Sequence, residues 1–459
     1  MRGFGGATLA QTIATAAAAP VPRKWPIEEG PDTPKICLGP WDGGGPLPAG
    51  LQPPPTATAP AAPQAGRGGG FGGFLAPRTE AASPPGEAAP VLRASVGGFG
   101  RNLTARYQRI RQLGVTHLLG VGVAGGTPWT EENIRIAIQT AKEAGLVAYN
   151  TMIGVPASVI HGTESRAKDM EPIIASIEAA GKAGLPVIEY NFYVHRAIEG
   201  YYERVGRARA GYTGFDYELE LLVDENGGVV QPIYRDENGQ ITPETLAAFP
   251  NAKKVKFKDL PPLANEGAHN LQEMWANVTY FLKAAVPAAE KAGVRLALHP
   301  NDPPAPISRG SQQIMGTVAG CKHLIEIVNS PANGITFDCG VTREMGDDPV
   351  QVAEYFASRK RINHMHYRNV QVVKPYEKYQ EVFIDAGMGD MFGVMKALVR
   401  NKYTGTIYPE HPRALDADRD RVVPGNRIIG YYPGDGGYTG ITYSVAYARA
   451  MMQAALESM

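Results

Sequence analysis

From about residue 91 to the end of the chain, short apolar runs alternate with longer amphipathic segments. The short runs are rich in Val, Ile and Leu, which is typical of buried parallel strands. We predict strands over 91–97, 115–123, 146–150, 186–191, 294–299, 333–338, 362–367 and 405–410. The segments between them space their apolar residues as helices do. We predict helices over 103–113, 130–144, 167–184, 269–292, 312–328, 348–359, 390–401 and 441–457.

This alternation of eight strands with eight helices predicts a (β/α)8 TIM barrel over residues 91–459. A doubly wound open sheet is the alternative, but no GxGxxG motif follows the first predicted strand. The connection after the fourth strand, residues 192–268, is far longer than the others, and such loops are usually functional or carry elements of their own. Within it, "VVQPIYRDENGQITP" predicts a hairpin with an Asn-Gly turn.

Residues 1–90 differ from the rest of the chain, because Pro and Gly are too frequent there for regular elements. We therefore expect an N-terminal extension. Its first residues, "MRGFGGATLAQTIATAAAAP", resemble the second half of a twin-arginine export signal. A surface-packed or disordered extension is the alternative, so the cytoplasm and the periplasm both stay open as compartments.

Charge and cysteine content exclude several classes of partner. The chain has 45 basic and 45 acidic residues, a formal net charge of zero, and no basic run. This composition argues against nucleic acid and anionic membranes as partners. The three cysteines form no CxxC pair and are too few for a disulfide framework, and no apolar run is long enough to cross a bilayer.

The last four predicted strands each carry a residue that can bind a metal at or next to their carboxyl end: His299, Asp338, His366 and Glu410. In a barrel the carboxyl ends of the strands converge on one mouth. A single histidine in such a position is more often structural, but four coordinating residues on successive strands indicate a shared site. Two imidazoles and two carboxylates suit a divalent transition metal, with Mn²⁺ expected and Fe²⁺, Co²⁺ or Mg²⁺ as alternatives.

Polar residues next to these four are candidates for catalysis and substrate binding. His411 follows Glu410 directly, and a neutral imidazole beside a cation is a good general base. An arginine near a metal can hold a carboxylate through two hydrogen bonds; surface and loop positions are the alternative interpretation. The candidates for substrate binding are Arg368, Asn369, Arg413, Asn301 and Asp302.

The choice between Asp338 and Cys339 follows from the alternation of side chains along a strand. In "NGITFDC", Thr336 and Asp338 share one face, whereas Ile335, Phe337 and Cys339 share the other. The apolar face is expected to pack on the helices, so that Asp338 points into the barrel mouth.

Several motifs resemble one enzyme family, best from residue 270 onward. They are "NLQEMWANVTYFLKAAVPAAEKAGVRLALHPNDPP", "INHMHYRNV", "GDMFGVMKAL", "YPEHPR" and "EYNF". This pattern resembles the mannonate dehydratases, which have a xylose-isomerase-like barrel. The family has Cys at the position of Asp338 and Asp at the positions of Asn301 and Glu410.

The resemblance implies dehydration of D-mannonate to 2-keto-3-deoxy-D-gluconate with Mn²⁺. It places His299, His366 and Glu410 on metal-ligand positions and His411 on a catalytic position. Tyr443, in "GITYSVAYARAMM", falls on a second proton-transfer position. We also expect a homo-oligomer that acts on a small sugar acid.

Two other functions stay open on the sequence. The ligand set His, Asp, His, Glu also resembles that of sugar isomerases and epimerases with the same barrel. A non-catalytic sugar-binding barrel is the third possibility, although all four strand ends keep a coordinating residue.

Overall fold

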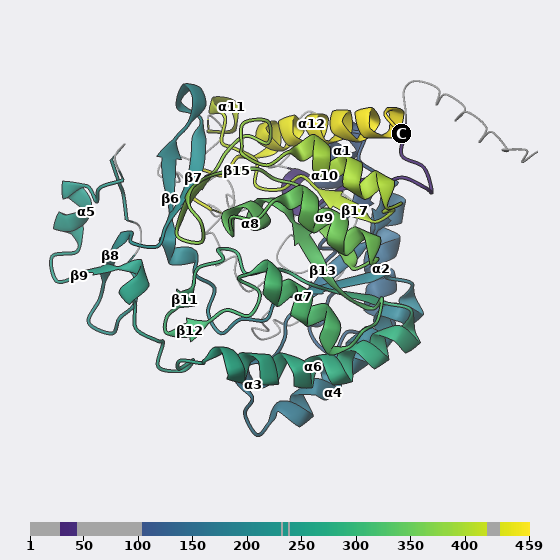
Figure 1. Ribbon diagram of the computed structural model, residues 1–459, viewed down its shortest axis with the longest axis horizontal. Coiled ribbons are helices and arrows are strands. Elements are labelled where there is room, and N and C mark those ends of the chain that lie inside the picture. The colour runs from purple at the N-terminus through teal and green to yellow at the C-terminus, as the bar shows by residue number, and fades with distance from the viewer. Residues whose placement is uncertain (1–27, 44–102, 231–232, 237–238, 420–431) are drawn as a thin grey trace, which may run out of the picture.

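The computed structural model describes residues 28–43, 103–230, 233–236, 239–419 and 432–459. They form a closed parallel barrel with helices around it (Figure 1), which confirms the predicted fold class. In spatial order its strands are β1 (Lys35–Leu38), β2 (His117–Leu118), β3 (Val147–Ala148), β4 (Asn150–Ile153), β5 (Val187–Tyr190), β10 (Arg295–Leu298), β13 (Asn333–Asp338), β14 (Ile362–His366) and β17 (Thr406–Tyr408). Only Tyr149 separates β3 from β4, so together they act as one bent strand between β2 and β5. The pairing of β1 with β17 closes the barrel.

The outer helices lie close to the predicted ranges, because the sequence marks their ends. Thr130 accepts a hydrogen bond from the Asn133 N–H at the start of α2, and Asn270 and Glu273 form a capping box at the start of α6. The helices between barrel strands are α1 (Leu103–Gln112), α2 (Glu131–Glu143), α3 (Ala157–His161), α4 (Arg166–Ala183), α6 (Leu271–Ala292), α7 (Val318–Ile327), α8 (Cys339–Glu344), α9 (Pro349–Ser358) and α10 (Met391–Arg400), and α11 (Asp416–Arg419) and α12 (Tyr438–Glu457) follow the last strand. None of the helices in the described ranges combines the length and the apolar character needed to cross a bilayer.

The first barrel strand differs from the prediction. The expected strand 91–97 lies outside the described residues, whereas β1 comes from the segment predicted to be an extension. Ile36, Cys37 and Leu38 are fully buried. Strand β1 pairs with β17 along one edge and with β2 along the other. The Pro and Gly residues around "KICL" hide this short strand in the sequence, so the predicted boundary at residue 90 does not separate an extension from the barrel.

We expect Leu38→Ala to lower the free energy of unfolding by about 2–5 kcal/mol, the range for deleting a buried leucine side chain. Urea unfolding followed by circular dichroism measures this change. Val147→Ala is the control, because Val147 lies on a barrel strand but is 51% exposed. Equal small effects of the two substitutions would contradict the place of β1 in the barrel.

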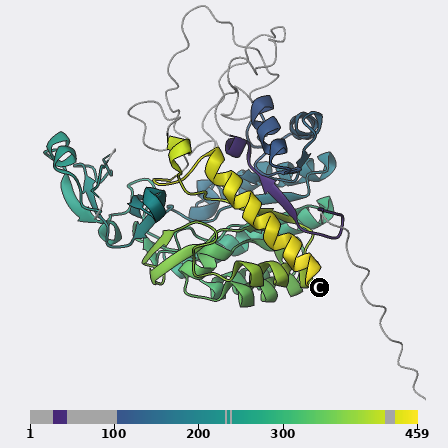
Figure 2. The ribbon, with the colours of Figure 1, turned by 90° about the horizontal axis from the view of Figure 1, so that it is seen from above.

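The long connection after β5 forms an appendage on one side of the barrel, where β8 (Glu220–Val223), α5 (Pro243–Ala248) and β9 (Lys253–Lys256) project farthest from it (Figures 1 and 2). The predicted hairpin is present, since Arg235 pairs with Ile241 and the Asp236 N–H donates to the Gln240 carbonyl. Gly239 takes the left-handed conformation in its turn, with φ of 80°. Asn238 lies outside the described residues.

A small antiparallel sheet joins the appendage to the barrel mouth. Strands β6 (Tyr201–Val205) and β7 (Gly211–Asp216) come from the appendage, and β15 (Val370–Lys374) and β16 (Lys378–Glu381) from the loop after β14. The order is β15-β16-β7-β6, so β7 and β16 pair across the two segments. The remaining short elements are β11 (Ile307–Ser308), β12 (Ser311–Gln312) and the 3-10 turns Pro40–Gly43, Ile198–Gly200, Arg207–Arg209 and Phe257–Asp259.

Candidate metal centre

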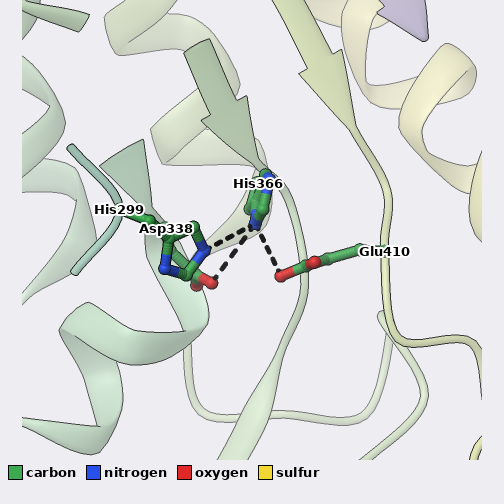
Figure 3. A group of neighbouring side chains, drawn as sticks. All are labelled: His299, Asp338, His366 and Glu410. Atoms are coloured by element: carbon green, nitrogen blue, oxygen red, sulfur yellow. Dashed lines mark hydrogen bonds and ion pairs between the residues drawn. The ribbon is translucent and has the colours of Figure 1, made fainter. Parts of the chain in front are cut away.

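The four predicted ligands meet at the carboxyl end of the barrel (Figure 3). The strand register brings them there, because Asp338 on β13 pairs directly with His366 on β14. His299 follows the last residue of β10, and Glu410 lies two residues beyond β17. One donor atom from each residue lies within 4.8 Å of the other three. We call these four residues the ligand cluster.

The spacing of the donor atoms fits a metal ion. His366 Nδ1 is 3.0 Å from His299 Nε2, 2.9 Å from Glu410 Oε1 and 3.8 Å from Asp338 Oδ2. Atoms bound at about 2.1 Å to one ion lie about 3.0 Å apart at right angles and about 3.4 Å apart at tetrahedral angles. All three separations are near these values, so the described side chains could bind an ion with small adjustments.

The hydrogen bonds of the two imidazoles also favour a cation. His299 Nδ1 lies 2.7 Å from the Pro300 carbonyl and donates to it, so Nε2 is the nitrogen that faces the cluster. Burial and the neighbouring His299 hold the pKa of His366 well below its usual range, so His366 is neutral. Ring nitrogens and carboxylate oxygens therefore converge on the space between the four side chains.

Asp338 lies in the ligand cluster and Cys339 lies outside it. Asp338 Oδ2 faces the cluster, while its Oδ1 accepts from the Val341 N–H at the start of α8. The Cys339 thiol is buried and donates to the carbonyls of His366 and Arg368. The alternation of side chains along β13 therefore gives the geometry that we expected.

Arg368 is not placed as a clamp for a substrate carboxylate. Its Nε donates to Asp338 Oδ2 at 3.0 Å and to Glu410 Oε1 at 3.1 Å, and its Nη1 donates to Glu344 Oε1 at 2.7 Å. Asp302 and Glu381 lie 3.4 and 3.6 Å from the same guanidinium. The side chain is buried, so in this arrangement Arg368 neutralises and orients carboxylates of the protein.

His411 lies beside the cluster with unusual electrostatics. Its Nδ1 is 2.9 Å from Glu381 Oε2, and its Nε2 is 3.5 Å from Glu410 Oε2. Burial disfavours the charged ring, but Glu381 and Glu410 outweigh it and raise the pKa of His411 to about 10. The sequence predicted a neutral base, whereas this environment favours an imidazolium that can donate a proton. A cation at Glu410 would offset part of this effect.

Arg413 is fully buried, and protein acceptors use its donors. It donates to Glu381 Oε2 at 2.8 Å, to Asp435 Oδ1 at 2.7 Å and to Thr213 Oγ1 at 2.7 Å. The prediction that Arg413 binds substrate is therefore not supported. Its guanidinium holds Glu381, which in turn holds His411.

We expect Arg413→Met to lower the free energy of unfolding by about 3–5 kcal/mol, because Glu381 and Asp435 would stay buried without their cation. Urea unfolding gives the value. Arg400→Met is the control, since Arg400 pairs with Glu354 on the surface, where ion pairs contribute about 0–1 kcal/mol. Equal losses for both variants would contradict the structural role of Arg413.

Asn301 and Asn369 also have structural partners. Asn301 Oδ1 accepts from the Met315 N–H, and Asn369 bonds to backbone groups of Ile384 and Gly389. Asp302 is buried too, and its Oδ1 accepts from the Tyr201 hydroxyl at 2.6 Å. The structure thus places these three predicted substrate-binding residues in the supporting framework of the mouth.

The described contacts of Tyr443 do not reach the ligand cluster. It is part of α12, and its hydroxyl donates to Asp385 at 2.7 Å and accepts from Arg207. These described contacts link Tyr443 to the appendage and the β16 loop. None of these described contacts joins Tyr443 to His411.

Sequence reasoning missed several buried groups around the mouth. Glu189 lies inside the barrel on β5, and burial raises its pKa to about 8 despite hydrogen bonds from Thr336 and Asn150. A glutamate within the apolar run "PVIEYN" is a signal that could have identified it. The other missed residues are Tyr201, Glu344, Tyr379 and Glu381, whose segments carry no such signal.

Comparisons with known proteins match the chain to one family. The family model described as D-mannonate dehydratase (UxuA) matches residues 92–452. A mannonate dehydratase from Streptococcus equi subsp. zooepidemicus is 30% identical over 341 residues, which cover 72% of this chain and 85% of that protein. One from Enterococcus faecalis is 30% identical over 332 residues, covering 67% and 85%. The solved structure of mannonate dehydratase from Streptococcus suis serotype 2 superposes with a TM-score of 0.58 and 26% identity, covering 77% of this chain and 91% of that chain.

Proposed function

Because this chain belongs to the D-mannonate dehydratase family, a family of hydro-lyases, we propose that it dehydrates D-mannonate to 2-keto-3-deoxy-D-gluconate. The ligand cluster is the observation that supports this most directly. Dehydration of a sugar acid removes a proton from the carbon next to the carboxylate, and such a proton becomes acidic when the carboxylate and the 2-hydroxyl bind a cation.

We infer that the site holds one divalent cation. Donor atoms of His299, Asp338, His366 and Glu410 converge within 4.8 Å of one another, with spacings that fit one ion. When bound, the ion would polarise the carboxylate and 2-hydroxyl of the substrate and stabilise the charge that develops at C2.

Mn²⁺ is our proposal for this ion. Two imidazoles with two carboxylates form a mixed nitrogen and oxygen set, which suits Mn²⁺, Fe²⁺ or Co²⁺ better than Mg²⁺. The thiol of Cys339, which would favour zinc, lies outside the cluster.

His411 is proposed as the residue that moves a proton during the reaction. In the described arrangement it holds its proton at neutral pH, which suits the acid that protonates the departing 3-hydroxyl. Glu381 fixes the ring through Nδ1, so Nε2 is the nitrogen that points toward Glu410 and the cluster. Arg413 and Asp435 hold Glu381 and its neighbourhood in place.

A panel of aldonates tests the proposed reaction. We expect the protein loaded with Mn²⁺ to form a 2-keto-3-deoxy product from D-mannonate, and protein stripped with EDTA to form none. D-Gluconate is the matched control substrate, since it differs from D-mannonate only at C2 and would give the same product. Absence of product from every aldonate, together with conversion of an aldose to a ketose, would instead indicate the isomerase that the sequence left open.

The sequence-based expectation of a homo-oligomer remains a prediction. Analytical ultracentrifugation of the purified protein would decide it. Family membership favours the dehydratase over the isomerase and over the sugar-binding protein.

A further inference from the structure

A second group of polar side chains lies inside the barrel, beneath the ligand cluster. It consists of Glu189 on β5 with His364 and His366 on β14, and one donor atom of each lies within 4.8 Å of the others. Glu189 and His364 are buried, and His366 is shared with the ligand cluster. This group faces Nε2 of His366, while Nδ1 faces the cluster.

The distances in this group are too long for direct hydrogen bonds. His366 Nε2 is 3.9 Å from Glu189 Oε1, and His364 Nε2 is 4.0 Å from Glu189 Oε2. Within the described residues, His364 Nε2 is a buried atom without a hydrogen-bond partner, although Nδ1 of the same ring contacts the Thr406 hydroxyl at 2.8 Å. A buried polar nitrogen without a partner is costly, so a bridging group is expected.

A water molecule and a second metal ion are the two groups that could bridge these atoms. Atoms bound at about 2.1 Å to one ion at tetrahedral angles lie about 3.4 Å apart. Atoms that hydrogen-bond at about 2.8 Å to one water lie about 4.6 Å apart at the same angle. Separations of 3.9 and 4.0 Å lie between these two values, so the distances alone fit both. A neutral imidazole has one lone pair, and His366 turns Nδ1 toward the ligand cluster, so its Nε2 carries the proton and can donate to a water but cannot bind a second ion.

We propose that Glu189, His364 and His366 hold one buried water molecule, through which Glu189 fixes the tautomer of His366. The water accepts from His366 Nε2–H and donates to His364 Nε2 and Glu189. A protonated Glu189 fits as well, because it can donate to the same water. His366 Nδ1 then keeps its lone pair for the ion. Glu189 and His364 act as positioning residues, and this inference rests on the proposed function in taking His366 as a metal ligand.

The two histidine ligands would then be oriented by different means. His299 is fixed by a direct bond from Nδ1 to the Pro300 carbonyl, whereas His366 depends on the water and Glu189. Partners of metal-bound histidines in such positions usually contribute about 10–100-fold in metal affinity. Loss of the water should therefore weaken metal binding without removing any ligand.

Titration calorimetry with Mn²⁺ tests the role of Glu189. We expect Glu189→Leu, which cannot hold the water, to raise Kd about 10–100-fold. Glu189→Gln keeps a polar group and should stay within a few-fold of the unsubstituted protein. Glu189→Met keeps the length of the side chain without its polar atoms and should lose affinity as Glu189→Leu does, whereas a purely steric role would leave it unchanged. Thr151→Val, a buried substitution on the adjacent strand β4, is the control. Unchanged affinity in Glu189→Leu would overturn the proposal.

Two measurements on the unsubstituted protein keep the test decisive if Glu189→Leu does not fold. A crystal structure with Mn²⁺ should show one water within hydrogen-bond distance of all three side chains, and ¹⁵N NMR should show His366 protonated at Nε2. Empty density at this position would overturn the proposal. If the protein bound no divalent cation, the proposed metal site would fail, while the crystal structure would still decide on the water.

Discussion

Asp338→Ala is expected to abolish Mn²⁺ binding and to lower kcat/KM for D-mannonate by more than about 100-fold, because a ligand contributes more than the groups that orient it. Asp338 is buried in the ligand cluster and carries one of its two carboxylates. Calorimetry with Mn²⁺ and steady-state kinetics measure the two effects. Alanine also removes the cap of α8, so the free energy of unfolding should fall by about 1 kcal/mol.

Two further variants separate the ligand role from the structural one. Asp338→Asn keeps a good helix cap but removes the charge, so it should lose the metal with little loss of stability. Cys339→Ala should keep metal and activity, because its thiol contacts only backbone carbonyls among the described hydrogen bonds. Loss of the metal in Cys339→Ala and its retention in both Asp338 variants would show that the ligand set is wrong.

His411→Asn is expected to lower kcat by about 100- to 10,000-fold, the usual contribution of a general acid or base. Asparagine suits the position because His411 has φ of 47°, a left-handed conformation that asparagine tolerates well. Asparagine can also hydrogen-bond to Glu381, so the buried carboxylate keeps a partner. The fold should therefore survive, and calorimetry should show Mn²⁺ binding within a few-fold of the unsubstituted protein.

His323→Asn is the control. His323 lies exposed on α7, so its substitution should leave kcat unchanged. Full activity of His411→Asn would exclude His411 from proton transfer. If the variant bound Mn²⁺ much more weakly, His411 would act on the metal site rather than on the substrate.

The barrel and the ligand cluster could be predicted because both follow from local rules. Each buried parallel strand is a short apolar run, and every such strand in a barrel ends at the same mouth. Asp338 and His366 end adjacent strands, so their pairing in the register follows from the strand ends alone.

The surroundings of the cluster could not be predicted, because they depend on contacts between distant segments. Arg413 sits in a loop typical of substrate-binding residues, yet its partner Glu381 comes from β16 and Thr213 from the appendage. No local sequence pattern shows that Glu381 and Thr213 accept the hydrogen bonds of the Arg413 guanidinium. The strand β1 was missed for another reason. Its four residues lie between Pro and Gly and are too few to show a recurring pattern of apolar residues.

The pairing of β1 with β17 has a consequence for the synthesis of the protein. Lys35 pairs with Thr406, so the barrel joins two segments from near opposite ends of the chain. At translation rates of about 5–20 residues per second, β17 follows β1 from the ribosome after roughly 20–70 s. Until then β1 can pair with a neighbouring strand on one edge at most, the edge that β2 takes in the finished barrel. Closure of the barrel is therefore a post-translational or very late event, and nascent chains should depend on chaperones that shield an incomplete barrel.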